Sequence, residues 1–195
     1  MEKTTKLLGG WGYIALVVGG LLGFLGPFSG VITLAGMVCV LIAFYRAGGE
    51  LNLPSIKRDI TIAIVLNVVA YVLFLFIVGS ALIAYFAQVG HMGNNDANAA
   101  AVLGAGTIFA ALLTWVLIIV GSWFWYKASQ AMADGTGVGT YKTGGLLIFI
   151  GSIAIIVFFI GFLVIWIGEI IQTVAFFSSP EHTVDTTEPP ASSPG

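Results

Sequence analysis

Long apolar runs constrain this chain more than any other feature of its sequence. Five segments are almost wholly apolar, and they lie at about residues 7–25, 31–45, 60–86, 102–126 and 146–174. A helix needs about 20 mostly apolar residues to cross the hydrocarbon core of a bilayer. Only 8% of the residues are charged, against about 25% in an ordinary globular domain. The chain is therefore predicted to be an all-α, polytopic transmembrane bundle with about five spans.

Two features of the first hairpin leave alternatives open. The segment 31–45 is short for a span, so it either takes length from the preceding turn or is re-entrant. Lys3 and Lys6 precede the first apolar run, as in a secretory signal peptide, but no small-residue cleavage site follows it. We expect an uncleaved first span.

The basic residues predict an orientation. With five spans, all 7 lysines and arginines fall in the N-terminal tail, the loop 46–59 or the loop 127–142. The positive-inside rule places these pieces in the cytoplasm. After Phe177 the chain is polar and rich in proline and serine, so it cannot bury apolar surface. We expect residues 1–177 to form the membrane domain and residues 178–195 to form a disordered tail outside the cell.

The fourth segment carries several aromatic residues. Trp123, Trp125 and Tyr126 lie at its inner end, where amphipathic rings prefer the headgroup level. Trp115 lies in mid-span, so it must pack within the bundle or face lipid tails. Good helix formers follow, which predicts that this helix projects from the membrane to about Asp134, with Gly135 as a C-cap.

Glu169 is the sharpest candidate for a functional site. A carboxylate at the centre of a membrane helix costs about 2.5–3.5 kcal/mol on insertion scales, and such groups are often functional. The last apolar run is longer than a bilayer needs, however, so its outer end can emerge among the headgroups. We favour this interfacial position. The alternative is a proton or cation site.

Asn67 lies inside the third span. Hydrogen bonds between membrane helices contribute about 0.6 kcal/mol on average. We expect structural hydrogen bonding rather than ion coordination at Asn67. The same interpretation applies to the other small polar residues within spans, which are Thr33, Thr114, Ser122 and Ser152.

Glycines are the most widespread pattern. Gly19 and Gly23 form a G-x-x-x-G pair, while Gly151, Gly161 and Gly168 can share one face of the fifth helix. Small residues allow membrane helices to approach closely. The pattern predicts close packing, either within the bundle or between copies of the chain.

Other classes of site have little support. The net charge of -2 does not imply a nucleic-acid partner. A single cysteine, Cys39, excludes an intrachain disulfide and any multi-cysteine metal site. His91 and His182 have no paired ligands nearby, so no metal site is expected. We also expect no cofactor and no catalytic residues, because no nucleophile–base or paired-carboxylate pattern is present.

Three stretches of the chain resemble a known family. They are WYKASQAMADGTGVGTYKTGGLLIFIG from Trp125, QTVAFFS from Gln172 and KLLGGWG from Lys6. They are similar to a family of prokaryotic, largely archaeal, multi-span membrane proteins, domain of unknown function 996. The resemblance extends to about Ser179. It implies the helical architecture and brings no reaction, ligand or site residue with it.

Two functional hypotheses follow. The favoured one is a non-enzymatic scaffold or accessory subunit in the cell membrane, since few ionisable groups are buried and small packing residues are common. The alternative is a small oligomeric transporter or channel for an ion or small solute, because Glu169 and Asn67 lie in spans and glycine-interrupted helices often line transport sites. The expected partners are the lipid bilayer and either further copies of the chain or another membrane protein.

Overall fold

The computed structural model describes residues 1–22, 28–90, 97–155 and 160–181. These residues form six α-helices and no strand, which confirms the all-α class. The helices are α1 (Lys3–Leu21), α2 (Phe28–Glu50), α3 (Pro54–Gly90), α4 (Ala97–Thr136), α5 (Thr140–Ala154) and α6 (Ile160–Ser178).

Within the described residues, four helices are long and apolar enough to cross a membrane. The four stretches are Ser29–Glu50, Pro54–Ile77, Gly106–Thr136 and Ile160–Ser178. The short second segment of the sequence lies within α2, which reaches 23 residues. At about 1.5 Å per residue this helix is about 34 Å long, enough to cross the hydrocarbon core.

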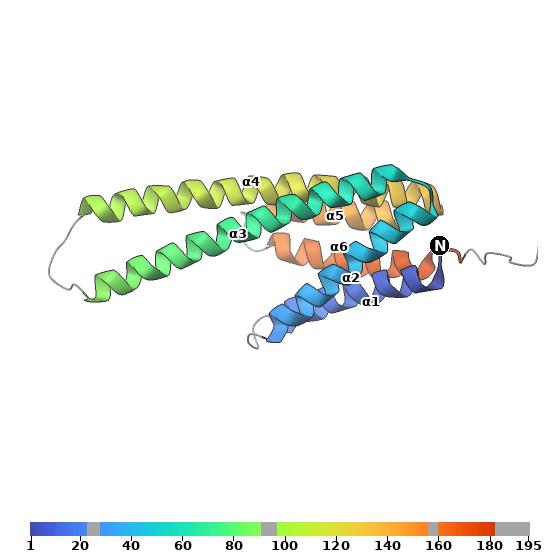
Figure 1. Cartoon of the computed structure of the whole chain (residues 1–195), viewed down its shortest axis with the longest axis horizontal. Coiled ribbons are helices and arrows are strands. Elements are labelled where there is room, and N and C mark those ends of the chain that lie inside the picture. The colour runs from blue at the N-terminus through green and yellow to red at the C-terminus, as the bar shows by residue number, and fades with distance from the viewer. Residues whose placement is uncertain (23–27, 91–96, 156–159, 182–195) are drawn as a thin grey trace, which may run out of the picture.

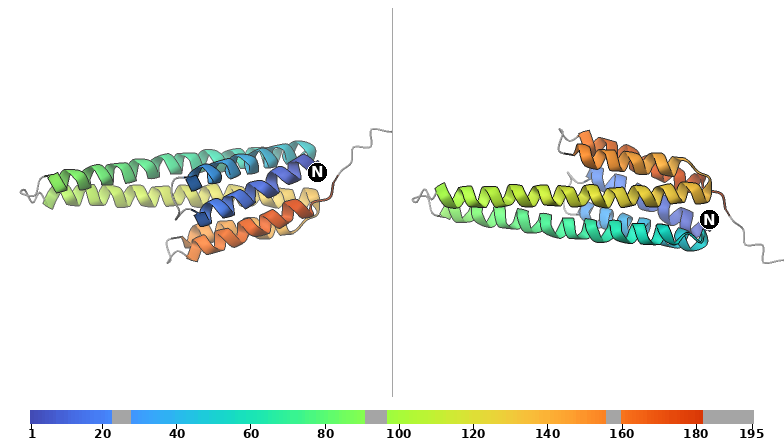
Figure 2. Two further views of the ribbon diagram at one scale, coloured as in Figure 1. Left: turned by 90° about the horizontal axis from the view of Figure 1, so that it is seen from below. Right: turned by 90° about the horizontal axis from the view of Figure 1, so that it is seen from above.

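The described helices form a closed ring of three hairpins. α1 pairs with α2, α3 with α4 and α5 with α6, and each hairpin contacts the next. α1 also contacts α6, so the last helix meets the first. Figures 1 and 2 show the three hairpins side by side with their long axes roughly aligned. Neighbours in the sequence are therefore neighbours in space, and the ring has a centre that all six helices can reach.

The α2–α3 and α4–α5 turns lie at the same end of the ring as Met1. Each turn contains a residue with a left-handed backbone, Asn52 in the first and Gly137 in the second. α2 ends in a Schellman motif: Asn52 has φ 54°, and the Leu53 amide donates to the Gly48 carbonyl oxygen (3.0 Å). Pro54 then opens α3, where a missing amide hydrogen costs nothing. α4 runs to Thr136, and Gly137 at φ 74° ends it, so the C-cap expected at Gly135 is wrong by two residues.

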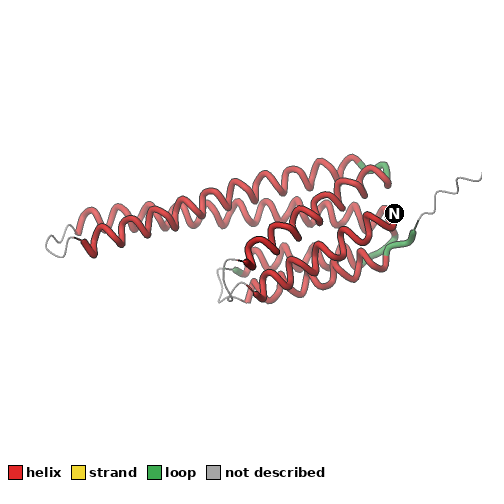
Figure 3. The backbone as a smooth tube through the Cα atoms, turned by 60° about the horizontal axis from the view of Figure 1, so that its bottom comes forward, coloured by secondary structure: helices red, strands yellow, loops and turns green. Residues whose placement is uncertain are grey.

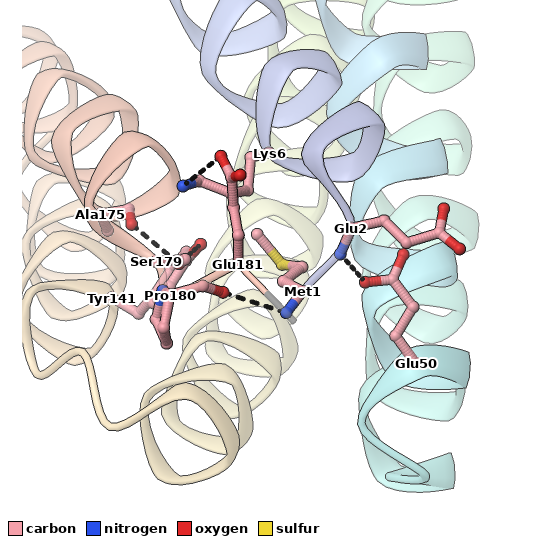
Figure 4. Close-up of polar contacts among 9 residues, drawn as sticks. All are labelled: Met1, Glu2, Lys6, Glu50, Tyr141, Ala175, Ser179, Pro180 and Glu181. Atoms are coloured by element: carbon pink, nitrogen blue, oxygen red, sulfur yellow. Dashed lines mark hydrogen bonds and ion pairs between the residues drawn. The ribbon is translucent and has the colours of Figure 1, made fainter. Parts of the chain in front are cut away.

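The same end of the ring holds the start of the chain and residues 179–181, and we call it the polar end. The Met1 amino group donates to the Pro180 carbonyl oxygen (3.0 Å), and Lys6 pairs with Glu181 (3.3 Å) (Figure 4). The Glu2 amide donates to Glu50 on α2 (2.7 Å). These contacts join α1, α2 and the segment after α6. Apart from Glu169, every charged side chain that the structure describes lies within nine residues of a helix end at the polar end.

The fifth expected span, 146–174, is not one helix. The structure divides it into α5 and α6, which pack against each other as a hairpin. A methyl group added to Gly168 would lie 2.8 Å from the Gly144 carbonyl oxygen, and one added to Gly151 would lie 2.8 Å from the Gly161 carbonyl oxygen. These glycines therefore face each other across two helices rather than sharing one face of a single helix.

This division also corrects the expected topology. An additional helix brings the chain back, so residues 178–181 lie at the polar end beside Met1 and not at the opposite end of the bundle. In the described residues the start of the chain and the end of α6 therefore lie at one end, whereas the five-span prediction separated them. The remainder of the expected tail, residues 182–195, lies outside the described residues. All seven basic residues and the start of the tail share one end.

The α3–α4 hairpin is longer than the rest of the ring (Figure 3). α3 has 37 residues and α4 has 40, which correspond to about 55 and 60 Å. Large apolar side chains are exposed along its outer part, among them Phe74, Phe76 and Phe109. In water such a surface would be costly, whereas lipid or another apolar chain can cover it.

The shared polar end makes a topology prediction. In a Cys39→Ala background, Thr140→Cys and Glu181→Cys will react alike with a membrane-impermeant thiol reagent, and Asn95→Cys between α3 and α4 will react from the opposite side. Thr140 and Glu181 are both exposed at the polar end. Labelling of intact cells and inverted vesicles measures this. Opposite accessibility of Thr140→Cys and Glu181→Cys would contradict the six-helix arrangement.

Candidate functional site

Glu169 lies in the middle of α6. It is nine positions from Ile160 at one end and nine positions from Ser178 at the other, a distance of about 13 Å each way. The interfacial position favoured from the sequence assumed one long helix over 146–174. Because that segment is a hairpin, Glu169 is far from both ends of its helix, and the reason for placing it among the headgroups is lost.

The Glu169 carboxylate is mostly enclosed by protein. Its Oε2 atom is buried and has no hydrogen-bond partner. Leaving a buried acceptor unpaired costs roughly 1–3 kcal/mol, and more when the group is charged. The unpaired oxygen of this carboxylate does not stabilise the folded protein. Costly ionisable groups of this kind in membrane helices are often functional.

Glu169 lines a cavity of about 220 Å³ at the centre of the ring. Every one of the six helices contributes to its wall. The lining residues are Tyr13 and Leu16 on α1, Met37 on α2, Asn67 on α3, Ile118, Ser122 and Trp125 on α4, Ile148 and Ser152 on α5, and Ile165 and Glu169 on α6. The structure thus brings together the two residues, Glu169 and Asn67, that the sequence offered as an ion site.

Asn67 also makes local contacts. Its Nδ2 atom donates to the Ala63 carbonyl oxygen one turn earlier on α3 (2.8 Å). A methyl group at Gly121 would lie 2.7 Å from the same nitrogen, so the side chain packs directly against α4. Asn67 therefore helps to hold α3 against α4 while one side of it faces the cavity.

Two serines give the cavity acceptor character. The hydroxyls of Ser122 and Ser152 donate to carbonyl oxygens of their own helices, at 2.9 and 2.8 Å. Each hydroxyl has only one hydrogen, so its oxygen lone pairs are what remains for a ligand. The Trp115 indole donates to the Ser152 carbonyl oxygen (3.0 Å), which places this mid-span tryptophan within the bundle.

Two aromatic residues on the cavity wall were not identified from the sequence as site residues. Trp125 is 8% exposed, so its expected place among the headgroups is wrong. Its indole N–H donates to the Tyr13 hydroxyl (3.0 Å), and the rings meet edge to face with centroids 6.4 Å apart. A signal was available, because Ser122, Trp125, Ser129 and Met132 recur at the helical spacing of one face.

An aromatic cluster separates the cavity from the polar end. Tyr13 and Trp125 contact Phe44 and Phe176, with ring centroids 5.6–6.4 Å apart, and Tyr141 packs on Phe176 at 5.1 Å. Phe176 lies seven residues beyond Glu169 on α6, which is about 10 Å toward the polar end. Five helices contribute to this cluster, so it both fastens the ring and closes the cavity on that side.

A polar network lies beside the cluster. The Gln172 side chain, one turn from Glu169, donates through Nε2 to the Ser129 hydroxyl (2.9 Å) and to the Tyr141 carbonyl oxygen (3.0 Å). Its Oε1 atom is buried without a partner. The Tyr141 hydroxyl then contacts the Ser179 hydroxyl (2.8 Å), and Ser179 donates to the Ala175 carbonyl oxygen (Figure 4). Polar groups therefore continue from the level of Glu169 to the polar end.

The cavity wall carries one carboxyl group and no basic side chain. Among its lining residues, Glu169 is the only Asp or Glu, and none is Lys, Arg or His. A carboxylate in a low-dielectric site needs a counter-charge or a proton. The chemistry that this arrangement supports is the reversible binding of a proton or a cation.

The remaining predicted features lie elsewhere. Gly19 packs against Thr33 of α2, and Gly161 and Gly168 lie in the α5–α6 contact with Gly151. Gly23, His91 and His182 lie outside the described residues. A second cavity, also about 220 Å³, is lined only by residues of the α2–α3 turn, from Gly48 to Lys57. No residue of the loop 127–142 lines it.

The unpaired carboxylate makes a stability prediction. At pH 8, where an ordinary carboxyl group is ionised, Glu169→Gln will stabilise the folded protein in mild detergent by about 1–2 kcal/mol, because it removes a buried charge and keeps the shape. Chemical or thermal unfolding followed by circular dichroism measures this. Glu181→Gln, which alters a carboxylate paired at the surface, should change stability little. A large loss of stability in Glu169→Gln would mean that the carboxylate has a structural partner.

Comparison with known proteins identifies a family and a relative, both of unknown function. Residues 32–170 match the family described as "Protein of unknown function (DUF996)". The chain is also 27% identical over 179 residues to the uncharacterised protein MJ1644 of Methanocaldococcus jannaschii, covering 92% of this chain and 93% of that protein. No solved structure matches the chain. The family match covers more than half of the sequence, so the chain is a member of the DUF996 family, whose function is unknown.

Proposed function

We propose that this protein is a small, non-enzymatic transporter of the cell membrane that moves a monovalent cation, with Glu169 taking up either a proton or the cation. One observation carries the proposal. The only charged side chain that lines the central cavity is a mid-helix carboxylate with a buried, unpaired oxygen. A structural carboxylate would be expected to have a partner in the folded chain.

The ring gives this site a suitable setting. All six described helices reach the cavity, and ion or substrate sites in membrane bundles are built from side chains on facing helices near the midplane. Since Glu169 has no basic partner there, its charge is neutralised only by what enters. A proton and a cation therefore compete for the same carboxylate, which is the physical basis for exchanging one for the other.

Transport also requires access from both sides. The aromatic cluster of Tyr13, Phe44, Trp125, Tyr141 and Phe176 closes the side toward the polar end. The Gln172–Ser129 hydrogen bond, beside that cluster, joins α6 to α4. Movement of the α5–α6 hairpin relative to α4 would break this bond and open the cluster. We therefore infer that the α5–α6 hairpin moves relative to α4 during transport.

The direct test is proteoliposome flux. The purified protein is reconstituted with a luminal pH dye, a pH gradient is imposed, and Na⁺, K⁺ or a small organic ammonium ion is added one at a time. At least one of these cations should accelerate proton movement relative to protein-free vesicles. Glu169→Gln should reduce that acceleration about tenfold or more, because the amide cannot carry the exchanged charge.

Matched controls decide the outcome. Glu181→Gln removes a carboxylate at the polar end, outside the cavity, and should keep the flux of the parent protein. A flux that is equal in the parent, Glu169→Gln and protein-free vesicles for every cation would overturn the proposed function.

A second role is favoured by the α3–α4 hairpin. This hairpin is about 55–60 Å long, and Phe74, Phe76 and Phe109 on its outer part are each more than half exposed. A scaffold or accessory subunit would use such a surface to hold another membrane protein. Its packing glycines and the near absence of buried ionisable groups suit that role as well.

Extraction in a mild detergent separates the two roles. Native mass spectrometry of the complex from native membranes should show a second protein in fixed stoichiometry if the chain is an accessory subunit. A monomer or a homo-oligomer would favour transport. Substituting Phe76 and Phe109 with alanine should release the partner in the first case, while Trp11→Ala, at another exposed aromatic position on α1, should not.

A further inference from the structure

We propose that the cavity selects a small organic ammonium ion, held by the Glu169 carboxylate and by the ring of Trp125, which Tyr13 fixes in place. This inference rests on the proposed function, because it names the class of cation that the Glu169 site takes. It is carried by the size of the cavity and by the chemistry of its wall, which together favour an alkylated cation over an inorganic one.

The size of the cavity is the first argument. Its volume is about 220 Å³, whereas one water molecule occupies about 30 Å³ of liquid, so the cavity has room for about seven waters. A bare monovalent metal ion would fill little of this space. Pockets for drug-sized ligands are larger, at about 300–1,000 Å³. The intermediate volume suits a compact ammonium ion with a few carbon atoms.

The wall chemistry is the second argument. An inorganic cation must replace its hydration shell with several oxygen ligands. Here five of the eleven lining residues are aliphatic or thioether side chains, Leu16, Met37, Ile118, Ile148 and Ile165, which offer an inorganic ion no strong ligand. An ammonium ion covered by alkyl groups gives up little hydration and gains contact with these same side chains. It needs one counter-charge, and the cavity has one.

The aromatic pair is the third argument. Quaternary ammonium ions bind over the faces of Trp and Tyr rings, whose negative faces attract a cation. The hydrogen bond from the Trp125 indole to the Tyr13 hydroxyl (3.0 Å) holds the two rings at 86° to each other. Tyr13 is fully buried and fixes the orientation of Trp125, whose remaining accessible surface is on the cavity wall. The pair is thus fixed before a ligand arrives, which reduces the entropy lost on binding.

Binding of tetramethylammonium to the full chain in lipid nanodiscs tests this inference. Isothermal titration at pH 8 should show saturable binding of tetramethylammonium, at least tenfold tighter than that of K⁺. Tetrabutylammonium should not bind at the same site, because it exceeds the cavity. Both comparisons use the unaltered protein, so they do not depend on any variant folding correctly.

Two substitutions assign the binding to the cavity. Glu169→Gln should weaken tetramethylammonium binding about tenfold or more, while Glu181→Gln leaves it unchanged. Trp125→Phe keeps a ring but loses the indole and its bond to Tyr13, and should weaken binding about threefold to tenfold. Near-ultraviolet circular dichroism shows that each variant is folded.

The outcomes separate this inference from the function on which it rests. Absence of saturable tetramethylammonium binding, or binding of K⁺ with equal affinity, would overturn the ammonium site. If Glu169-dependent flux with Na⁺ or K⁺ persisted in that case, the transport proposal would stand and only the class of cation would be wrong. Tetramethylammonium binding with no flux for any cation would support the site and overturn transport.

Discussion

The close backbone approach of α5 and α6 is the contact on which the rest of this structure depends. Gly144 faces Gly168 and Gly151 faces Gly161, and at each pair an added methyl group would lie under 3 Å from a carbonyl oxygen of the other helix. Because lipid provides no hydrophobic force between helices, such close packing is what holds a membrane hairpin together. The hairpin folds the last apolar run back on itself, and the ring closes where α6 meets α1.

Closure of the ring places a costly group where it can act. With α6 folded back, Glu169 lies on the wall of a cavity reached by six helices instead of at a membrane surface. The aromatic cluster and the Met1–Pro180 and Lys6–Glu181 contacts stabilise the polar end. A bundle fastened in this way tolerates one unpaired carboxylate at its centre. Stability given up at one position and supplied elsewhere is typical of functional sites.

Much of the fold could be predicted from the sequence, because the signals are local. Apolar runs of sufficient length indicate membrane helices whatever their neighbours are, and the helical class and the candidate spans follow from them. Glu169 and Asn67 stood out for the same reason, since a polar side chain in an apolar run is visible without a structure. The division of 146–174 was missed because residues 146–168 contain no proline and no charged residue to mark a turn. The burial of Trp125 was not predicted because a tryptophan near the end of an apolar run usually indicates a headgroup anchor. Its contacts with Tyr13 on α1 and Phe44 on α2 become visible only when the helices are packed together.

The sequence by itself determined that this chain is helical, apolar and suited to a bilayer, and it placed every lysine and arginine in three short polar pieces. These properties depend on single residues and their immediate neighbours. Only the tertiary structure decided that the chain has six helices rather than five in the residues it describes, that both ends of that part meet at the polar end, and that Glu169, Asn67, Tyr13 and Trp125 share one cavity. The reason is that distances between helices are set by packing at particular glycines and rings, and the periodicity of one helix contains no information about which partner will fill its grooves.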